Sequence, residues 1–273
     1  MAKQFKTVEL FLALGLATAL GACNTPSTSG GEGSGAVSEA TPAATTHAGG
    51  ESHAQGGEGG EGGSTSGNVD VDYMVTLGLM KGHLLVAEEL REQGNYEEAE
   101  PHISHPVDEL YGSVEGQLSE RNVPEFKSTL VELQDLAKSA PDRPQTTTAF
   151  SAAEKSIDDA IAALPAEQRQ SPEFVVATIQ QMLTTAADEY EAAIAEGKFV
   201  ELVEYQDSRG FVLYAEELYK TIAEQMSQEN PDAHQVITSS LAKLKTAWPA
   251  VNPPATPVKT PSEVRDLVSK IKL

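Results

Sequence analysis

Two histidines and two glutamates lie close together in the sequence with the spacing of a metal site. His102 and His105 are three residues apart, and Glu98 and Glu109 each lie four residues outside one of them. On a helix, residues three or four apart share a face. Imidazole and carboxylate together suit zinc, iron or copper. The stretch therefore predicts part of a metal-binding site.

A third histidine belongs to the preceding helix and would meet this stretch across a turn. His83 lies eleven residues before Gly94, and His105 lies eleven residues after it. In an antiparallel hairpin that turns at Gly94, the two are level. Met80 lies one helical turn before His83, and its thioether would favour copper or haem. We predict ligands for zinc, copper, iron or haem, and they are the following residues: His83, His102, His105, Glu109 and Glu98.

A second interpretation of the same residues stays open. On an unbroken helix, His105 points nearly opposite the apolar stripe, which would leave one core histidine and two surface histidines beside solvated acids. Pro101 and Pro106 argue for a break, because each removes a helix hydrogen bond and favours a kink. A kink at this point would turn the histidines inward.

A further group of oxygen ligands surrounds a later turn. It consists of Asp188, Glu189, Glu204, Tyr205 and Asp207. Tyrosine and carboxylate oxygens can hold ferric iron, although exposed carboxylates on helices are usually only solvated.

Helices must position these residues, since apolar side chains recur at helical spacing nearly throughout the region after residue 70. We expect an all-α antiparallel helical bundle over 70–273. Thr260 with Glu263 and Ser151 with Glu154 fit the capping box that starts a helix. The expected helices are 71–93, 95–118, 123–139, 151–163, 172–196, 198–228, 232–246 and 261–271.

The bundle also shows signs of an internal duplication. Gly94-Asn95-Tyr96 and Gly197-Lys198-Phe199 occupy the same place between two expected helices, 103 residues apart. The same offset aligns Leu110-Tyr111 with Leu213-Tyr214. We therefore consider two related halves, 70–165 and 171–273.

The stretch Lys81-Gly82-His83-Leu84-Leu85-Val86, in an exported helical chain, is distantly similar to the imelysin and iron-uptake type of periplasmic proteins. Those carry a Gly-x-His-x-x-Glu motif, whereas here glycine is adjacent to histidine and Val86 stands where glutamate belongs. The resemblance implies a class, an exported helical metal-uptake protein, and no residue roles are transferred.

The N-terminus resembles the signal peptide of bacterial lipoproteins. Lys3 and Lys6 precede an apolar run, Leu10 to Leu20, that is too short to span a membrane. It ends in Leu20-Gly21-Ala22-Cys23, which resembles a lipobox. The resemblance implies removal of residues 1–22 and lipidation of Cys23, with acyl chains such as palmitate. Several chains would anchor the protein stably to a membrane.

A linker and an acidic composition complete the organisation. Residues 23–69 are rich in Gly, Ser, Thr and Glu, which predicts a disordered tether between Cys23 and the helical domain. The formal net charge is −22, so nucleic acid is not an expected partner. Cys23 is the only cysteine, which leaves no second thiol for a disulfide or a nucleophile.

No motif of a known catalytic mechanism is present, so we expect a binding protein and no enzyme. The sequence predicts a lipid-anchored protein of the cell envelope, on the inner or outer membrane and facing the periplasm or the exterior, with a helical domain that handles a metal ion or haem. The alternative is a structural module that binds an envelope protein and no small ligand.

Overall fold

The structure, a computed structural model, describes residues 66–273, and these are almost entirely helical. The one sheet among them is an antiparallel pair of two-residue strands, β1 (Ile194–Ala195) and β2 (Lys198–Phe199). The expected signal segment, Cys23 and nearly all of the linker lie outside the described residues. Within residues 66–273, no helix combines the length and apolar character needed to cross a membrane.

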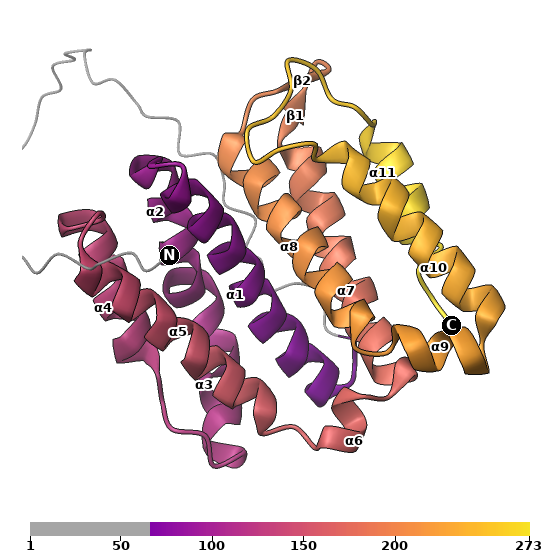
Figure 1. Cartoon of the computed structure of the whole chain (residues 1–273), viewed down its shortest axis with the longest axis horizontal. Helices are drawn as coiled ribbons and strands as arrows, with labels where there is room; N and C mark the ends of the chain where they lie inside the picture. The colour runs from indigo at the N-terminus through magenta and orange to yellow at the C-terminus, as the bar shows by residue number, and fades with distance from the viewer. Residues whose placement is uncertain (1–65) are drawn as a thin grey trace, which may run out of the picture. The chain divides into compact units, whose positions relative to one another are not determined.

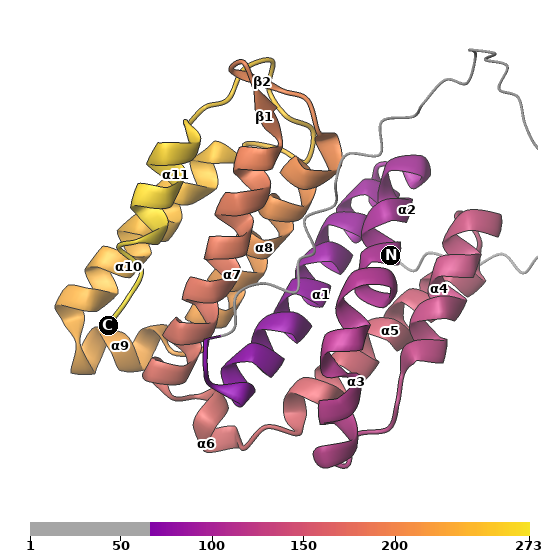
Figure 2. The ribbon, with the colours of Figure 1, turned by 180° about the vertical axis from the view of Figure 1, so that it is seen from behind.

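The helices form an all-α antiparallel bundle, which confirms the predicted fold class. Helices α1 and α8 lie side by side in the middle, with α2–α5 to one side and α7, α10 and α11 to the other (Figures 1 and 2). The helices before residue 165 are α1 (Val69–Glu92), α2 (Tyr96–His105), the π-helical turn η1 (Pro106–Leu110), α3 (Tyr111–Glu120), α4 (Lys127–Ser139) and α5 (Pro144–Ala162). Those after it are α6 (Ala166–Arg169), α7 (Pro172–Ala192), α8 (Leu202–Lys220), α9 (Ala223–Glu229), α10 (Pro231–Leu244), the 3₁₀ turn η2 (Lys245–Ala247) and α11 (Pro261–Val268).

Helix α1 is central because its apolar residues cover most of its circumference. Tyr73, Leu77, Met80 and Leu84 are each at most 1% exposed. Burying an aliphatic side chain of this size contributes about 1.5–3 kcal/mol, so a helix apolar on several faces is stable only between other helices. Helix α1 accordingly contacts α2, α5, α7 and α8.

Helices α1 and α8 cross closely because each has a glycine at the crossing. A Cβ atom added to Gly82 would lie 2.6 Å from Cδ1 of Phe211, and one added to Gly210 would collide with the backbone carbonyl of Gly82. Side chains at these positions would therefore push the helices apart. A Cβ atom added to Gly210 would also lie 2.9 Å from Cγ2 of Val86 on α1.

The two expected turns resemble each other in backbone conformation. Gly94, between α1 and α2, has a φ angle of +78°, and Gly197, between β1 and β2, has a φ angle of +73°. This left-handed region favours glycine because a Cβ would clash with the backbone. The duplication of 70–165 and 171–273 stays a prediction, since similar turns recur in unrelated helical hairpins.

Several helix boundaries differ from those expected. Ser151 lies inside α5, which begins at Pro144, so the capping box expected at Ser151 is wrong; proline at the first helical position starts this helix instead. The expected helix 198–228 is interrupted after Lys220 and resumes at Ala223. The capping box of Thr260 with Glu263 is confirmed at the start of α11.

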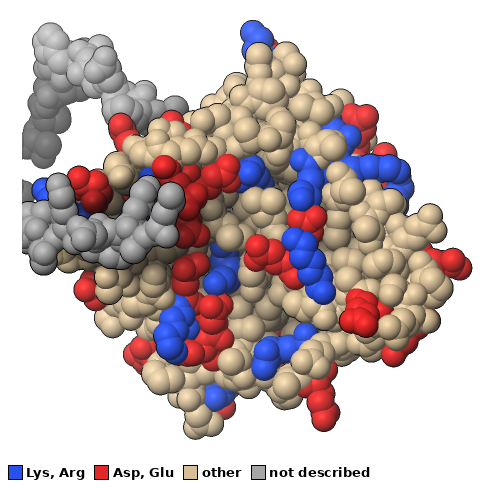
Figure 3. Space-filling view, viewed as in Figure 1, with Lys and Arg blue, Asp and Glu red and all other residues tan. Residues whose placement is uncertain are grey.

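Basic side chains on the surface lie among acidic ones. On the face in Figure 3, lysine and arginine side chains are interspersed with carboxylates. Ion pairs such as Lys245 with Glu216, at 2.8 Å, and Arg265 with Asp188, at 2.7 Å, show this mixing at the level of residues. Local pairing of this kind neutralises positive charge in a chain whose net charge is −22.

Candidate metal centre

The close crossing of α1 and α8 brings His83 and Asp207 together. His83 follows Gly82, and Asp207 lies one helical turn before Gly210. Because glycines let the two backbones approach, short side chains from both helices meet beside the crossing. His83 Nδ1 lies 2.6 Å from Asp207 Oδ1. Neither side chain is exposed to solvent.

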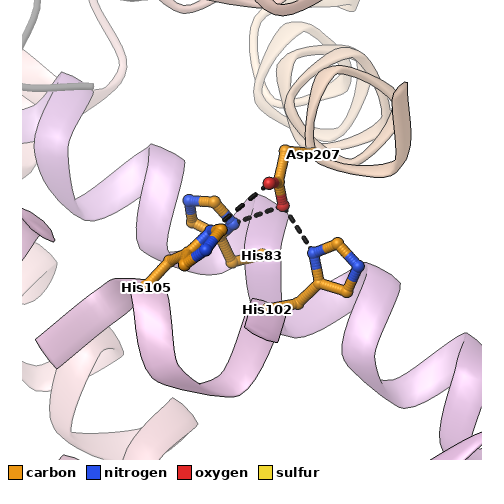
Figure 4. Close-up of side chains that lie close together, drawn as sticks. All are labelled: His83, His102, His105 and Asp207. Carbon is orange, nitrogen blue, oxygen red and sulfur yellow. Dashed lines mark hydrogen bonds and ion pairs between the residues drawn. The ribbon is translucent and has the colours of Figure 1, made fainter. Parts of the chain in front are cut away.

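Two more histidines reach the same carboxylate from α2. His102 Nδ1 also lies 2.6 Å from Asp207 Oδ1, and His105 Nδ1 lies 3.3 Å from Asp207 Oδ2. Figure 4 shows the three imidazoles converging on Asp207 from the α1–α2 hairpin, with α8 supplying the carboxylate. The structure thus brings together three of the predicted ligands: His83, His102 and His105.

The distances fit a single metal ion. One donor atom from each of the three histidines and from Asp207 can be chosen so that all four lie within 4.8 Å of one another. In a four-coordinate zinc site with ligand distances of about 2.1 Å, donor atoms are separated by about 3.4 Å. An ion would therefore widen the two 2.6 Å contacts and draw the most distant donors together by small side-chain movements.

Two buried polar atoms also favour a ligand at this point. Among the described residues, neither His105 Nδ1 nor Asp207 Oδ2 makes a hydrogen bond, although they face each other at 3.3 Å. Buried polar atoms of this kind are rare and call for a physical explanation. A cation between them would satisfy both the imidazole lone pair and the carboxylate.

The electrostatics keep Asp207 ready to bind a cation. Burial alone would raise the pKa of Asp207, but the charges of the His83 and His102 imidazoles and the contacts of the carboxylate with His102 and His105 hold this pKa well below its usual value. Burial alone would lower the pKa of His105, but the Asp207 carboxylate raises it above its ordinary value. Asp207 is therefore ionised at neutral pH, and a metal ion would compete with a proton for His105.

The predicted glutamates lie around the histidines and do not join the convergent donor atoms. Glu98 accepts a 3.3 Å hydrogen bond from Gln206 Nε2, and Gln206 Oε1 lies 2.8 Å from His102 Nε2. Glu109 Oε1 lies 3.8 Å from His105 Nε2, on the far side of that ring from Asp207. Glu109 thus contacts His105 on the outer side of the site, and Glu98 is linked to His102 through Gln206.

A π-helical turn explains how His102 and His105 can both face inward. The turn η1 begins at Pro106, and the backbone N–H of Tyr111 donates to the carbonyl of Pro106, five residues earlier. The wider turn inserts one residue into the register of the helix. On an unbroken helix, His105 would point away from the core if Val107 and Leu110 faced it. With the wider turn, Val107 and Leu110 are buried in the core although His105 faces inward.

Two contributors to the site, Asp207 and Gln206, are not grouped with the histidines by the sequence. The sequence places Asp207 in a separate group of oxygen ligands around the later turn, and nothing in the sequence singles out Gln206. Two other members of that group have partners away from the histidines: Tyr205 donates to the carbonyl of Ala250, and Asp188 pairs with Arg265. A signal for Asp207 was present in Gly210, because glycine in an apolar helix interior indicates close contact with another helix.

One comparison with known proteins relates the later part of the chain to a domain associated with iron permeases. Residues 165–273 match the family model of the iron permease-associated 4-helix bundle domain. The comparisons with curated proteins and with solved structures gave no match. The matched segment includes Asp207 and Gln206, whereas the three histidines precede it. The chain is thus a helical protein whose second half is similar to a domain associated with iron permeases.

Proposed function

We propose that the folded domain binds a first-row transition-metal ion through His83, His102, His105 and Asp207. The observation that carries the proposal is the convergence of three imidazole Nδ1 atoms on one fully buried carboxylate. Three neutral nitrogen donors and one anionic oxygen suit Fe²⁺, Zn²⁺ and Cu²⁺. The close packing of the rings, with the His83 and His105 centroids 5.0 Å apart, favours a bare ion over haem.

Iron is the cargo that we propose among these ions. The similarity of residues 165–273 to an iron permease-associated domain supports iron, since the donor set itself accepts several metals. We propose metal delivery or storage and no catalysis. The lipobox resemblance supports anchoring through Cys23 at the cell envelope, where the protein would hold iron near a membrane permease.

Calorimetric titration of the metal-free protein tests the binding site. The ions are Zn²⁺, Cu²⁺ and, without oxygen, Fe²⁺. We expect one ion per chain, and a loss of affinity of at least about 100-fold in the double variant His83→Ala/His105→Ala. His234→Ala is the matched control, because that histidine contacts Tyr219 on the far side of α8 and should leave affinity unchanged. A double variant that binds as tightly as the parent would show that the site is wrong.

A second candidate function is a helical module that binds an envelope protein without a metal. The name of the matched family, which refers to association with a permease, supports a protein partner. Crosslinking in intact membranes, followed by mass spectrometry, tests it in the parent and in the His83→Ala/His105→Ala variant. A permease crosslink that persists in the variant would favour the module, and a crosslink lost with the metal ligands would favour delivery.

A further inference from the structure

The candidate metal centre has one buried side and one side that reaches solvent. The side chains of His83, His102 and Asp207 are 0% exposed. The side chains of His105 and Glu109 are 16% and 17% exposed. An ion from solvent therefore meets His105 and Glu109 before it can meet the other ligands.

The buried ligands are also held more firmly. His102 lies between Asp207 Oδ1 and Gln206 Oε1, at 2.6 and 2.8 Å, so both ring nitrogens have close partners. His83 is 2.6 Å from Asp207 and packs edge-on against Phe211, with ring centroids 4.9 Å apart. These contacts restrict rotation of the two rings, which makes them a fixed part of the site.

His105 differs in its contacts and in its backbone. Its Nδ1 atom has a longer contact with Asp207, 3.3 Å to Oδ2, and makes no hydrogen bond within the described residues; its Nε2 atom lies 3.8 Å from Glu109 Oε1. It is the last residue of α2, directly before the proline that opens the π-helical turn. Proline lacks the N–H that bonds to an earlier carbonyl, so one helix hydrogen bond is missing directly after His105.

We propose that metal ions load and leave past His105 and Glu109, with Glu109 as the first carboxylate to bind the ion and His105 as the ligand that closes behind it. In an outward orientation the imidazole and Glu109 would share the ion at the surface. Rotation of the ring would then bring the ion to Asp207, His83 and His102. This inference rests on the proposed metal-binding function and adds the route of exchange.

Glu109 has a simpler alternative role as a fixed partner of His105. A fixed partner would orient the ring and raise the affinity by slowing release of the ion. A carboxylate on the loading route would instead raise the rate of loading, since a negative charge at the mouth of a site attracts cations. Loading and release rates therefore distinguish the two roles.

The experiment uses Co²⁺, whose visible absorption reports bound ion directly. Stopped-flow mixing measures loading of the metal-free full-length protein, and excess chelator measures release. The variants are Glu109→Gln, which removes the charge, and Glu109→Asp, which keeps it. Glu115→Gln on α3 is the control, because Glu115 is an exposed carboxylate nearby in the chain.

We expect Glu109→Gln to slow loading about tenfold, and Glu109→Asp to keep most of the parent rate. Glu115→Gln should load at the parent rate. Loading of Glu109→Gln as fast as the control, or a change confined to faster release, would overturn the route. If the parent protein takes up no Co²⁺, the proposed function itself fails, and that result is distinct from failure of the route alone.

Discussion

Replacing Asp207 with asparagine removes the one negative charge at the centre while keeping the shape of the side chain. The carboxylate has two contacts of 2.6 Å, with His83 and His102, and one of 3.3 Å with His105. Charge-assisted hydrogen bonds contribute about 1.5–3 kcal/mol each, roughly twice as much as neutral ones. Asparagine would keep about half of the energy of each short contact and would lose the attraction to His105. We therefore expect the free energy of unfolding of the metal-free protein to fall by about 2–4 kcal/mol.

The effect of Asp207 and His105 on stability depends on pH. The pKa of Asp207 is depressed in the folded state, so its contribution is present above the unfolded pKa of about 3.9 and lost only as pH falls towards the folded value. The pKa of His105 is raised, so its contribution is full below about 6.5 and is lost as pH rises through the folded value. The metal-free parent should therefore be more stable at pH 6 than at pH 8, and Asp207→Asn should reduce this difference.

Urea unfolding at pH 6 and pH 8, followed by circular dichroism, measures both effects. Asp159→Asn is the matched control, since Asp159 makes only an exposed pair with Lys155 worth under about 0.5 kcal/mol. Calorimetry on Asp207→Asn should show metal affinity at least about 100-fold lower than in the parent. An Asp207→Asn protein as stable as the control, with an unchanged pH dependence, would refute this account of the buried charge.

Two further predictions follow from the geometry and a third from the lipobox resemblance. Gln206→Leu should weaken metal binding about 10- to 100-fold in calorimetry, because Gln206 Oε1 contacts His102 Nε2; unchanged affinity would mean that this contact does not orient the ring. Gly210→Ala should destabilise the fold by about 1–3 kcal/mol in urea, because the added methyl meets the backbone of α1, whereas Gly112→Ala, with open space around it, should not destabilise it. Cys23→Ala should shift the protein from the membrane to the soluble fraction of cells; full retention in the membrane fraction would contradict lipid anchoring.

The helical architecture followed from the sequence because helix periodicity is a local signal. Apolar residues at helical spacing after residue 70 predict a helical bundle, and residues 66–273 form one. Helix boundaries are harder to predict than the helices themselves. The start expected at Ser151 is an example, since the helix begins at Pro144, with proline in the first helical position. Local patterns cannot decide between two plausible starts when packing against other helices stabilises the longer helix.

The candidate site was only partly predictable for a related reason. His83, His102 and His105 lie on one hairpin, so a turn at Gly94 was enough to place them together. Asp207 comes more than 100 residues after His102, and only the α1–α8 crossing brings it to them. The π-helical turn was not predicted either, although the two prolines indicated a break at that point.

The candidate ligands come from both sides of the α1–α8 crossing. The segment similar to the iron permease-associated domain supplies Asp207 and Gln206, while the preceding hairpin supplies every imidazole. A carboxylate with an amide beside it is a weak site for a transition metal, and three imidazoles without an anionic ligand leave the charge of the ion uncompensated. The complete donor set therefore exists only when α1 and α8 are packed at Gly82 and Gly210. An ion bound by this donor set would in turn stabilise that packing, because an ion that binds only the folded state shifts the folding equilibrium towards it.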